Sequence, residues 1–298
     1  MNDIDRRTFI KGSAVISAGL SHIVHTEANA SKPLSIKYEA GMIIPTRNIG
    51  DQKISRLIIG GNPFSHIAHS EPLIYSDELF QHYLTHEKII ETLKLAVKQG
   101  IDTFLGRIDE NVVAFLKLYY ESTGYMMPWI GQTAKKPHRG ATQQEIIENI
   151  QFAADNGAMG CYVQGESADY LVEQGKLDDI GSYLEYMRKT GMIAGVGAHD
   201  IATIEACEKA GIKTDFYMKT FNSLEYCCPH YARTVEFMSS VTVPWIAFKV
   251  LAAGRMQPNE GFREALKAKA DFLCVGMFDF QVERNATLAR ELFERPDI

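Results

Sequence analysis

The sequence predicts an α/β protein of the (β/α)8 barrel class, and three observations support this prediction. Short apolar runs alternate with amphipathic helical patterns, and the alternation repeats eight times along the chain. No glycine fingerprint of a dinucleotide-binding turn follows these runs, which makes a doubly wound open sheet the weaker alternative. With 298 residues, 46% of them hydrophobic, the chain can bury the core of a barrel in one domain.

Each apolar run has the length of a barrel strand and is followed by a helical pattern. The expected strands are 54–61, 101–105, 127–132, 159–163, 192–196, 215–218, 243–250 and 271–277. The expected helices are 87–100, 109–122, 142–157, 167–175 with 178–191, 201–211, 231–240, 261–270 and 281–293. Gly100 supplies a stop for the first helix, and Thr142 with Glu145 has the spacing of a capping box at the start of the third.

The segment 62–85 separates the first strand from its helix and is rich in His, Ser and Pro. Active sites of (β/α)8 barrels lie at the carboxyl ends of the strands, where this segment begins. We therefore expect 62–85 to form a long loop over that face of the barrel.

The first 30 residues resemble a twin-arginine export signal. They contain "DRRTFIKGSAVISAGLSHIVHTEANA", in which Arg6 and Arg7 precede a modest apolar run and Ala28-Asn29-Ala30 forms a small-x-small cleavage pattern. The expected organisation is a signal over 1–30 and a single barrel domain over 31–298. No later run approaches the roughly 18 uninterrupted apolar residues of a membrane span. These features predict an exported protein, periplasmic or associated with the cell envelope.

Charge and cysteine usage narrow the class of protein further. The formal net charge of −6 argues against a nucleic-acid partner. The five cysteines are an odd number without the spacing of a disulfide framework, so we expect most of them to be buried thiols. The twin-arginine route carries proteins that fold before export and can hold a cofactor, and the sequence does not identify one.

The order of several motifs resembles the aldo/keto reductase superfamily. The stretches "ISRLIIGGNPF" and "AVKQGIDTFLGR" are similar to the first two strands of that family, and "DFYMKTFNSL" to its sixth. "VPWIAFKVLAAGR" and "FLCVGMFDFQVERNATL" resemble its last two strands. The resemblance implies a (β/α)8 barrel of an oxidoreductase family, with Gln281 and Asn285 at the positions that contact NAD(P).

The catalytic tetrad of that family is not retained in the same alignment. Leu105 stands at the position of the Asp, Gln132 at that of the Lys and Gln164 at that of the His. The segment "GRIDEN" offers no tyrosine to act as proton donor. Because a reductase must stabilise a developing alkoxide and protonate it, conventional carbonyl reduction is not expected.

Other polar side chains follow the predicted strands and should converge on one cavity. Glu166 and His199 come from adjacent strands and form the expected acid/base pair. Lys219 and Lys249 end apolar strands, where either could stabilise an enolate or alkoxide, act as a nucleophilic amine or bind an anion. The expected substrate-binding residues are Asn62, Arg107, Asp109, Gln132, Gln164 and Arg255.

The sequence therefore predicts an enzyme that acts by acid/base chemistry on a small carbonyl or carbohydrate compound. A divalent metal is an alternative, with Glu166 and His199 as ligands and Asp109 or a residue of "CCPH" (227–230) as a third. Two further alternatives remain: an NAD(P)-dependent oxidoreductase with a relocated proton donor, and a non-catalytic barrel that binds a sugar or nucleotide.

Overall fold

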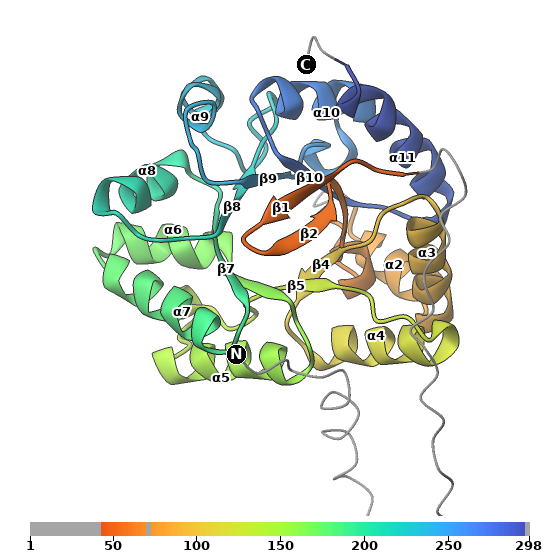
Figure 1. Cartoon of the computed structure of the whole chain (residues 1–298), viewed down its shortest axis with the longest axis horizontal. Coiled ribbons are helices and arrows are strands. Elements are labelled where there is room, and N and C mark those ends of the chain that lie inside the picture. The colour runs from red at the N-terminus through yellow and green to blue at the C-terminus, as the bar shows by residue number, and fades with distance from the viewer. Residues whose placement is uncertain (1–42, 70–72, 296–298) are drawn as a thin grey trace, which may run out of the picture.

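A computed structural model describes residues 43–69 and 73–295 and shows the predicted (β/α)8 barrel (Figure 1). Eight parallel strands pair in the closed order β10-β3-β4-β5-β6-β7-β8-β9. They are β3 (Leu57–Gly60), β4 (Phe104–Arg107), β5 (Trp129–Gln132), β6 (Gly160–Val163), β7 (Ile193–Ala198), β8 (Phe216–Thr220), β9 (Trp245–Phe248) and β10 (Phe272–Gly276).

The predicted helices surround the barrel. They are α3 (His86–Lys98), α4 (Glu110–Thr123), α5 (Gln143–Asp155), α6 (Gly165–Glu173), α7 (Leu177–Lys189), α8 (Ile201–Ala210), α9 (Tyr231–Met238), α10 (Pro258–Lys267) and α11 (Asp279–Phe293). The capping box of Thr142 and Glu145 is confirmed at the start of α5. Asp109, which the sequence analysis expected to bind substrate, caps α4 by accepting the backbone N–H of Val112 at 3.0 Å.

Two apolar layers make up the core. Side chains such as Ile58, Ile130 and Phe216 fill the inside of the barrel, and a larger cluster packs between the strands and the helices. Glycine is required at position 195 on β7, because a Cβ there would lie 2.4 Å from Cζ of Phe216. Large and small residues therefore alternate around the interior so that it closes without a pore.

A short antiparallel hairpin, which the sequence patterns did not indicate, closes the amino-terminal end of the barrel. It consists of β1 (Thr46–Ile49) and β2 (Gln52–Ser55), and Ile49 and Ile54 are buried in the same cluster as the interior side chains. Figure 1 shows the hairpin lying across the ring of strands. The barrel is therefore open to ligands at its carboxyl-terminal end.

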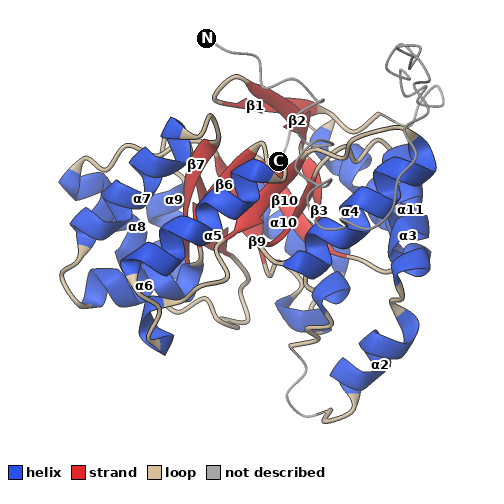
Figure 2. Ribbon diagram, turned by 90° about the horizontal axis from the view of Figure 1, so that it is seen from below, coloured by secondary structure: helices blue, strands red, loops and turns tan. Residues whose placement is uncertain are grey.

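The segment expected to be a long loop contains a helix. Residues 62–85 include the 3-10 turn η1 (Pro63–Ser65) and α2 (Ser76–Tyr83), and α2 projects beyond the end of the molecule opposite the hairpin (Figure 2). Phe80 and Tyr83 of α2 pack edge-on against Phe278, with ring centroids 5.0 and 5.7 Å apart. The segment therefore covers part of the mouth of the barrel, as predicted, but as a helix anchored to the start of α11.

The predicted export signal, 1–30, lies outside the described residues. Within residues 43–69 and 73–295 no helix combines the length and the apolar character that crossing a bilayer requires. Two further 3-10 turns complete the described elements, η2 (Pro137–Arg139) after β5 and η3 (Ala252–Gly254) after β9.

Candidate active site

A cavity of about 350 Å³ opens at the carboxyl ends of the barrel strands. Its walls come from the carboxyl ends of strands such as β4 and from the loops that follow β3, β5, β6, β7, β8, β9 and β10. The sequence-predicted residues that line it are Asn62, Arg107, Gln132, Gln164, Glu166, His199, Lys249 and Gln281. Asp109, Lys219, Arg255 and Asn285 are not part of its lining. The structure thus brings together most of the side chains that the strand ends were expected to supply.

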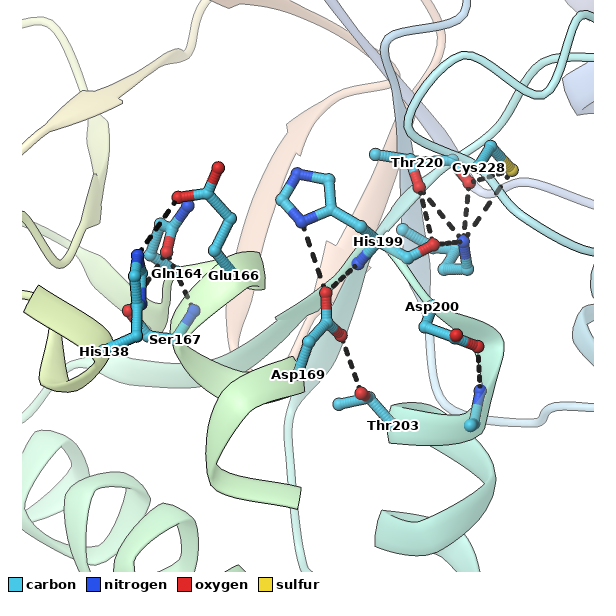
Figure 3. A network of polar contacts seen from close by, with 12 residues as sticks. His138, Gln164, Glu166, Ser167, Asp169, His199, Asp200, Thr203, Thr220 and Cys228 are labelled. Atoms are coloured by element: carbon cyan, nitrogen blue, oxygen red, sulfur yellow. Dashed lines mark hydrogen bonds and ion pairs between the residues drawn. The ribbon is translucent and has the colours of Figure 1, made fainter. Parts of the chain in front are cut away.

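His199 follows β7 and is held by a carboxylate that the sequence analysis did not single out. Oδ2 of Asp169, on α6, lies 3.3 Å from Nδ1 of His199 and accepts the backbone N–H of the same residue at 3.0 Å. Oδ1 of Asp169 accepts the hydroxyl of Thr203 at 2.6 Å. Figure 3 shows Nδ1 turned to Asp169 and the second ring nitrogen on the far side. His199 therefore presents Nε2 toward the cavity that it lines.

Glu166 also lines the cavity, but it pairs with other residues than His199. Its Oε2 accepts a hydrogen bond from Lys136 at 2.7 Å. The same oxygen lies 3.5 Å from Nε2 of His138 (Figure 3). Partial burial is the largest single influence on Glu166 and opposes its ionisation, but the hydrogen bond from Lys136 and the charges of Lys136, His199 and His138 together outweigh it and lower the pKa of the carboxyl group to about 2. The Glu166 carboxylate therefore stays ionised at neutral pH, where it is a weak base.

The two lysines have different environments. Lys219 is fully buried, and its Nζ donates to the His199 carbonyl oxygen at 2.7 Å and to the carbonyl and hydroxyl oxygens of Thr220 at 3.0 Å each. Burial lowers the pKa of the Lys219 ammonium. Its amine is thus occupied by oxygens outside the cavity lining, where Lys219 supports the backbone of His199.

Lys249, by contrast, lines the cavity and has an unusual backbone. Its φ of 54° lies in the left-handed region, which costs free energy for a residue with a side chain. Its Nζ lies 5.5 Å from the ring centroid of Tyr226, and the guanidinium of Arg255 lies 4.4 Å from the same ring. Arg255 is thus exposed beside Lys249 and outside the cavity lining.

Three side chains that were expected to stand at the tetrad positions line the cavity: Leu105 on β4, Gln132 on β5 and Gln164 after β6. Gln164 is largely used by the fold, because its Oε1 accepts both the N–H and the hydroxyl of Ser167 at 3.0 Å as the cap of α6. Leu105 contributes an apolar wall to the cavity.

The start of α11 does not fit the phosphate of a nucleotide. Asp279 places a carboxylate in its first turn, where Oδ1 accepts the hydroxyl of Tyr83 at 2.7 Å and Oδ2 accepts Nζ of Lys88 at 3.2 Å. The Oε1 of Gln281 accepts the N–H of Phe278 at 3.0 Å, and Asn285 is buried. Because a helix start binds an anion through free N–H groups, a carboxylate there would repel a second anion.

A metal site is not assembled in the described part of the chain. Within residues 43–69 and 73–295 no group of three or more His, Cys, Asp or Glu side chains converges as metal ligands would. The third ligand that the metal alternative requires is absent there: Asp109 pairs with Arg107 at 3.2 Å, and Cys228 is buried beside Lys219.

Comparison with known proteins shows the fold. No protein-family profile matches the chain, and no curated sequence matches it. A structure named as a candidate aldo-keto reductase from Pseudomonas aeruginosa has 13% identity and a TM-score of 0.61, covering 86% of this chain and 99% of its own. The glycerol dehydrogenase of Gluconobacter oxydans has 7% identity and a TM-score of 0.57, covering 84% of this chain and 90% of its own. The chain thus shares the (β/α)8 barrel of the aldo-keto reductases.

Several site residues were missed from the sequence. Asp169 lies one helical turn beyond Glu166, and its spacing from the end of β6 gave no separate signal. Lys136, in the loop after β5, and Tyr226, in the loop after β8, line the cavity from segments without periodic patterns. His69 lines it as well, and the concentration of histidines in 62–85 was the one feature that pointed to this segment.

Proposed function

We propose that this protein is an acid/base enzyme for a small carbonyl or carbohydrate compound, in which His199 exchanges a proton with the substrate. The pair of His199 with Asp169 carries the proposal. A carboxylate on Nδ1 fixes the tautomer and orientation of an imidazole and stabilises its protonated form, so Nε2 can accept and return a proton.

The groups around His199 complete the proposed chemistry. Removal of a proton next to a carbonyl places negative charge on the carbonyl oxygen, and Lys249 and Arg107 are the cations in the same cavity that would stabilise it. Leu105, Met218 and Phe248 supply apolar walls that strengthen these interactions by excluding water. Glu166 and Lys136 form a fixed ion pair that orients polar groups of the substrate.

The shared barrel and the motif order together support descent from the aldo/keto reductase superfamily, with a different site in place of the tetrad. The twin-arginine pattern in 1–30 supports export to the periplasm or the cell envelope. Together these features favour a role in processing small compounds outside the cytoplasm.

The proposal is tested by proton exchange in deuterated water. A panel of small aldoses, ketoses and 2-oxo acids is incubated with the protein, and NMR follows loss of the proton next to the carbonyl. We expect His199→Gln to lower the exchange rate by about 10² to 10⁴ and Asp169→Asn by about 10 to 10².

The matched control is Asp200→Asn. Asp200 follows His199 directly, but its carboxylate caps α8 through the N–H of Ala202 at 2.9 Å and does not contact the imidazole. This variant should retain the wild-type exchange rate. Exchange that survives in His199→Gln, or a wild-type protein that exchanges no compound of the panel, would refute the proposed chemistry.

A further inference from the structure

Backbone strain is concentrated on one side of the cavity mouth. Among the described residues, nine residues other than glycine have a positive φ. Eight of them lie on the loops that follow β3, β8 and β9: His66, His69, Glu225, Cys227, His230, Lys249, Ala252 and Ala253. Such strain persists where surrounding contacts enforce it, and it is typical of ligand-binding sites. Three loops distant in sequence thus hold a strained arrangement around His69 and Lys249.

The cavity lining carries more positively charged than negatively charged side chains. Arg107, Lys136 and Lys249 face a single carboxylate, that of Glu166. Lys136 pairs with Glu166, and Nε of Arg107 pairs with Asp109 at 3.2 Å. Lys249 forms no ion pair with a carboxylate in residues 43–69 and 73–295. The cavity therefore presents one lysine whose charge is not balanced by the chain.

Tyr226 joins this lysine to His69. Its ring lies against Nζ of Lys249, and its hydroxyl donates to the His69 carbonyl oxygen at 3.1 Å. The contact fixes the β3 loop, which carries His69, against the β8 loop, which carries Tyr226. His69, Tyr226 and Lys249 therefore form one connected corner of the cavity wall, and we call it the His69–Lys249 corner.

We propose that the His69–Lys249 corner binds an oxyanion, the carboxylate or phosphate group of the substrate. This inference rests on the proposed function and names its substrate class: a small anionic carbonyl compound, such as a 2-oxo acid, a sugar acid or a sugar phosphate. Lysine and protonated histidine both donate to anionic oxygen, and an anion at this corner would place the reacting carbon in the cavity that His199 lines.

The electrostatics of His69 agree with this assignment. Burial, and then the neighbouring charge of Lys249, lower the pKa of the His69 imidazole. The charges of Glu166 and Asp77 raise the pKa of His69, and the charge of His199 lowers it, as that of Lys249 does. An anion at the corner would offset the repulsion and favour the protonated ring. Anion binding should therefore take up a proton and become tighter as the pH falls from 8 to 6.

The experiment measures binding of inorganic phosphate and of acetate to the full chain by calorimetry, at constant ionic strength set with chloride. We expect at least one of the two anions to bind, and Lys249→Met to weaken that binding at least tenfold. Lys209→Met is the matched control, because Lys209 is an exposed lysine in the last turn of α8. Preference for phosphate would identify a phosphate ester, and preference for acetate a carboxylate.

A second variant of Lys249 distinguishes loss of the charge from misfolding of the protein. Lys249→Gly removes the charge and also relieves the left-handed backbone, so it should raise Tm by a few degrees while it loses anion binding. Equal binding of both anions by wild type and either Lys249 variant would overturn the inference, as would the absence of binding at pH 6. His199→Gln should still bind the anion, so failure of the anion site and failure of the proposed proton exchange are separable.

Discussion

The imidazole of His199 is fixed through both its ring and its backbone. Asp169 accepts from the backbone N–H and lies at Nδ1, whereas the carbonyl oxygen accepts from Nζ of Lys219 and from the hydroxyl of Thr220 at 3.1 Å. Such preorganisation keeps a catalytic group within reach of its substrate at no further entropic cost during the reaction. Lys219, expected from the sequence to act on the substrate, is thus a positioning residue in this structure.

Replacement of Lys219 tests this positioning role. Lys219→Met keeps the length of the side chain but leaves the carbonyl oxygens of His199 and Thr220 without their ammonium donor. We expect the free energy of unfolding, measured with urea, to fall by about 1–3 kcal/mol. Proton exchange at saturating substrate should fall as well, because His199 loses its support, while phosphate or acetate binding should stay unchanged. Borohydride reduction of a carbonyl adduct on Lys219 would contradict the assignment.

Most elements of the barrel could be predicted because their periodicity is local. Strands such as β6 and β7 are continuous buried runs, and helices such as α3 begin and end at recognisable caps. The helix α2 was not predicted because, of its eight residues, only Ser76 is buried. Its stability depends on contacts with Phe278 and Asp279, nearly 200 positions away. The hairpin β1–β2 depends in the same way on a barrel end that no local pattern reveals.

The sequence predicts which polar side chains lie at the strand ends, but not which of them pair with one another. Glu166 and Asp169 both lie in the first half of α6, so sequence alone cannot tell which carboxylate faces β7. The helix rotates about 100° per residue, and this rotation turns Asp169 toward His199 and Glu166 toward η2. Lys219 lies in β8 and Lys249 directly follows β9. The register pairs Lys219 with Ala247, so strand alternation alone would turn both lysines to the same side of the barrel wall. The left-handed backbone of Lys249, which no sequence pattern indicates, is the feature that distinguishes the two.

The start of α6 sets the position of the His199 ring. A Cβ added at Gly165 would lie 2.8 Å from Cε1 and 2.9 Å from Nδ1 of His199. Gly165→Ala should therefore displace the imidazole from Asp169 and lower the proton-exchange rate by about 10-fold or more. Gly175→Ala provides a comparison, because no atom lies within 4 Å of a Cβ there, although its φ of +68° makes that variant strained. A Gly165→Ala protein with wild-type exchange would show that the ring tolerates the added methyl group.

The two ends of the barrel have different roles: the amino-terminal end contributes to stability, and the carboxyl-terminal end carries the proposed site. The hairpin β1–β2 seals the amino-terminal end with apolar side chains, whereas the carboxyl-terminal end carries the cavity and the strained loops. Ionisable groups with shifted pKa values also gather at that second end, among them His69, His138 and Glu166. Protonation of these three side chains should therefore change both ligand binding and the stability of the fold.

The dependence of stability on pH follows from the directions of these shifts. Burial lowers the pKa values of His69 and His138, so the unfolded chain binds protons more readily and stability is lost as the pH falls below about 6.5. Glu166 has its pKa lowered to about 2, so its contribution is present above its unfolded value and is lost as the pH falls toward 2. Each step should not exceed about 1 kcal/mol, because these groups remain partly exposed.

Urea unfolding at pH 7.5, 5.5 and 3.5 separates the two steps. The wild-type chain should lose stability in both intervals. A double variant, His69→Gln with His138→Gln, should lose the upper step and keep the lower one, because its carboxylates are unchanged. Adding the preferred anion at pH 5.5 should restore stability in the wild-type chain, since the anion binds the protonated His69 of the folded state alone. An upper step of equal size in the double variant would assign the titration to groups outside the cavity mouth.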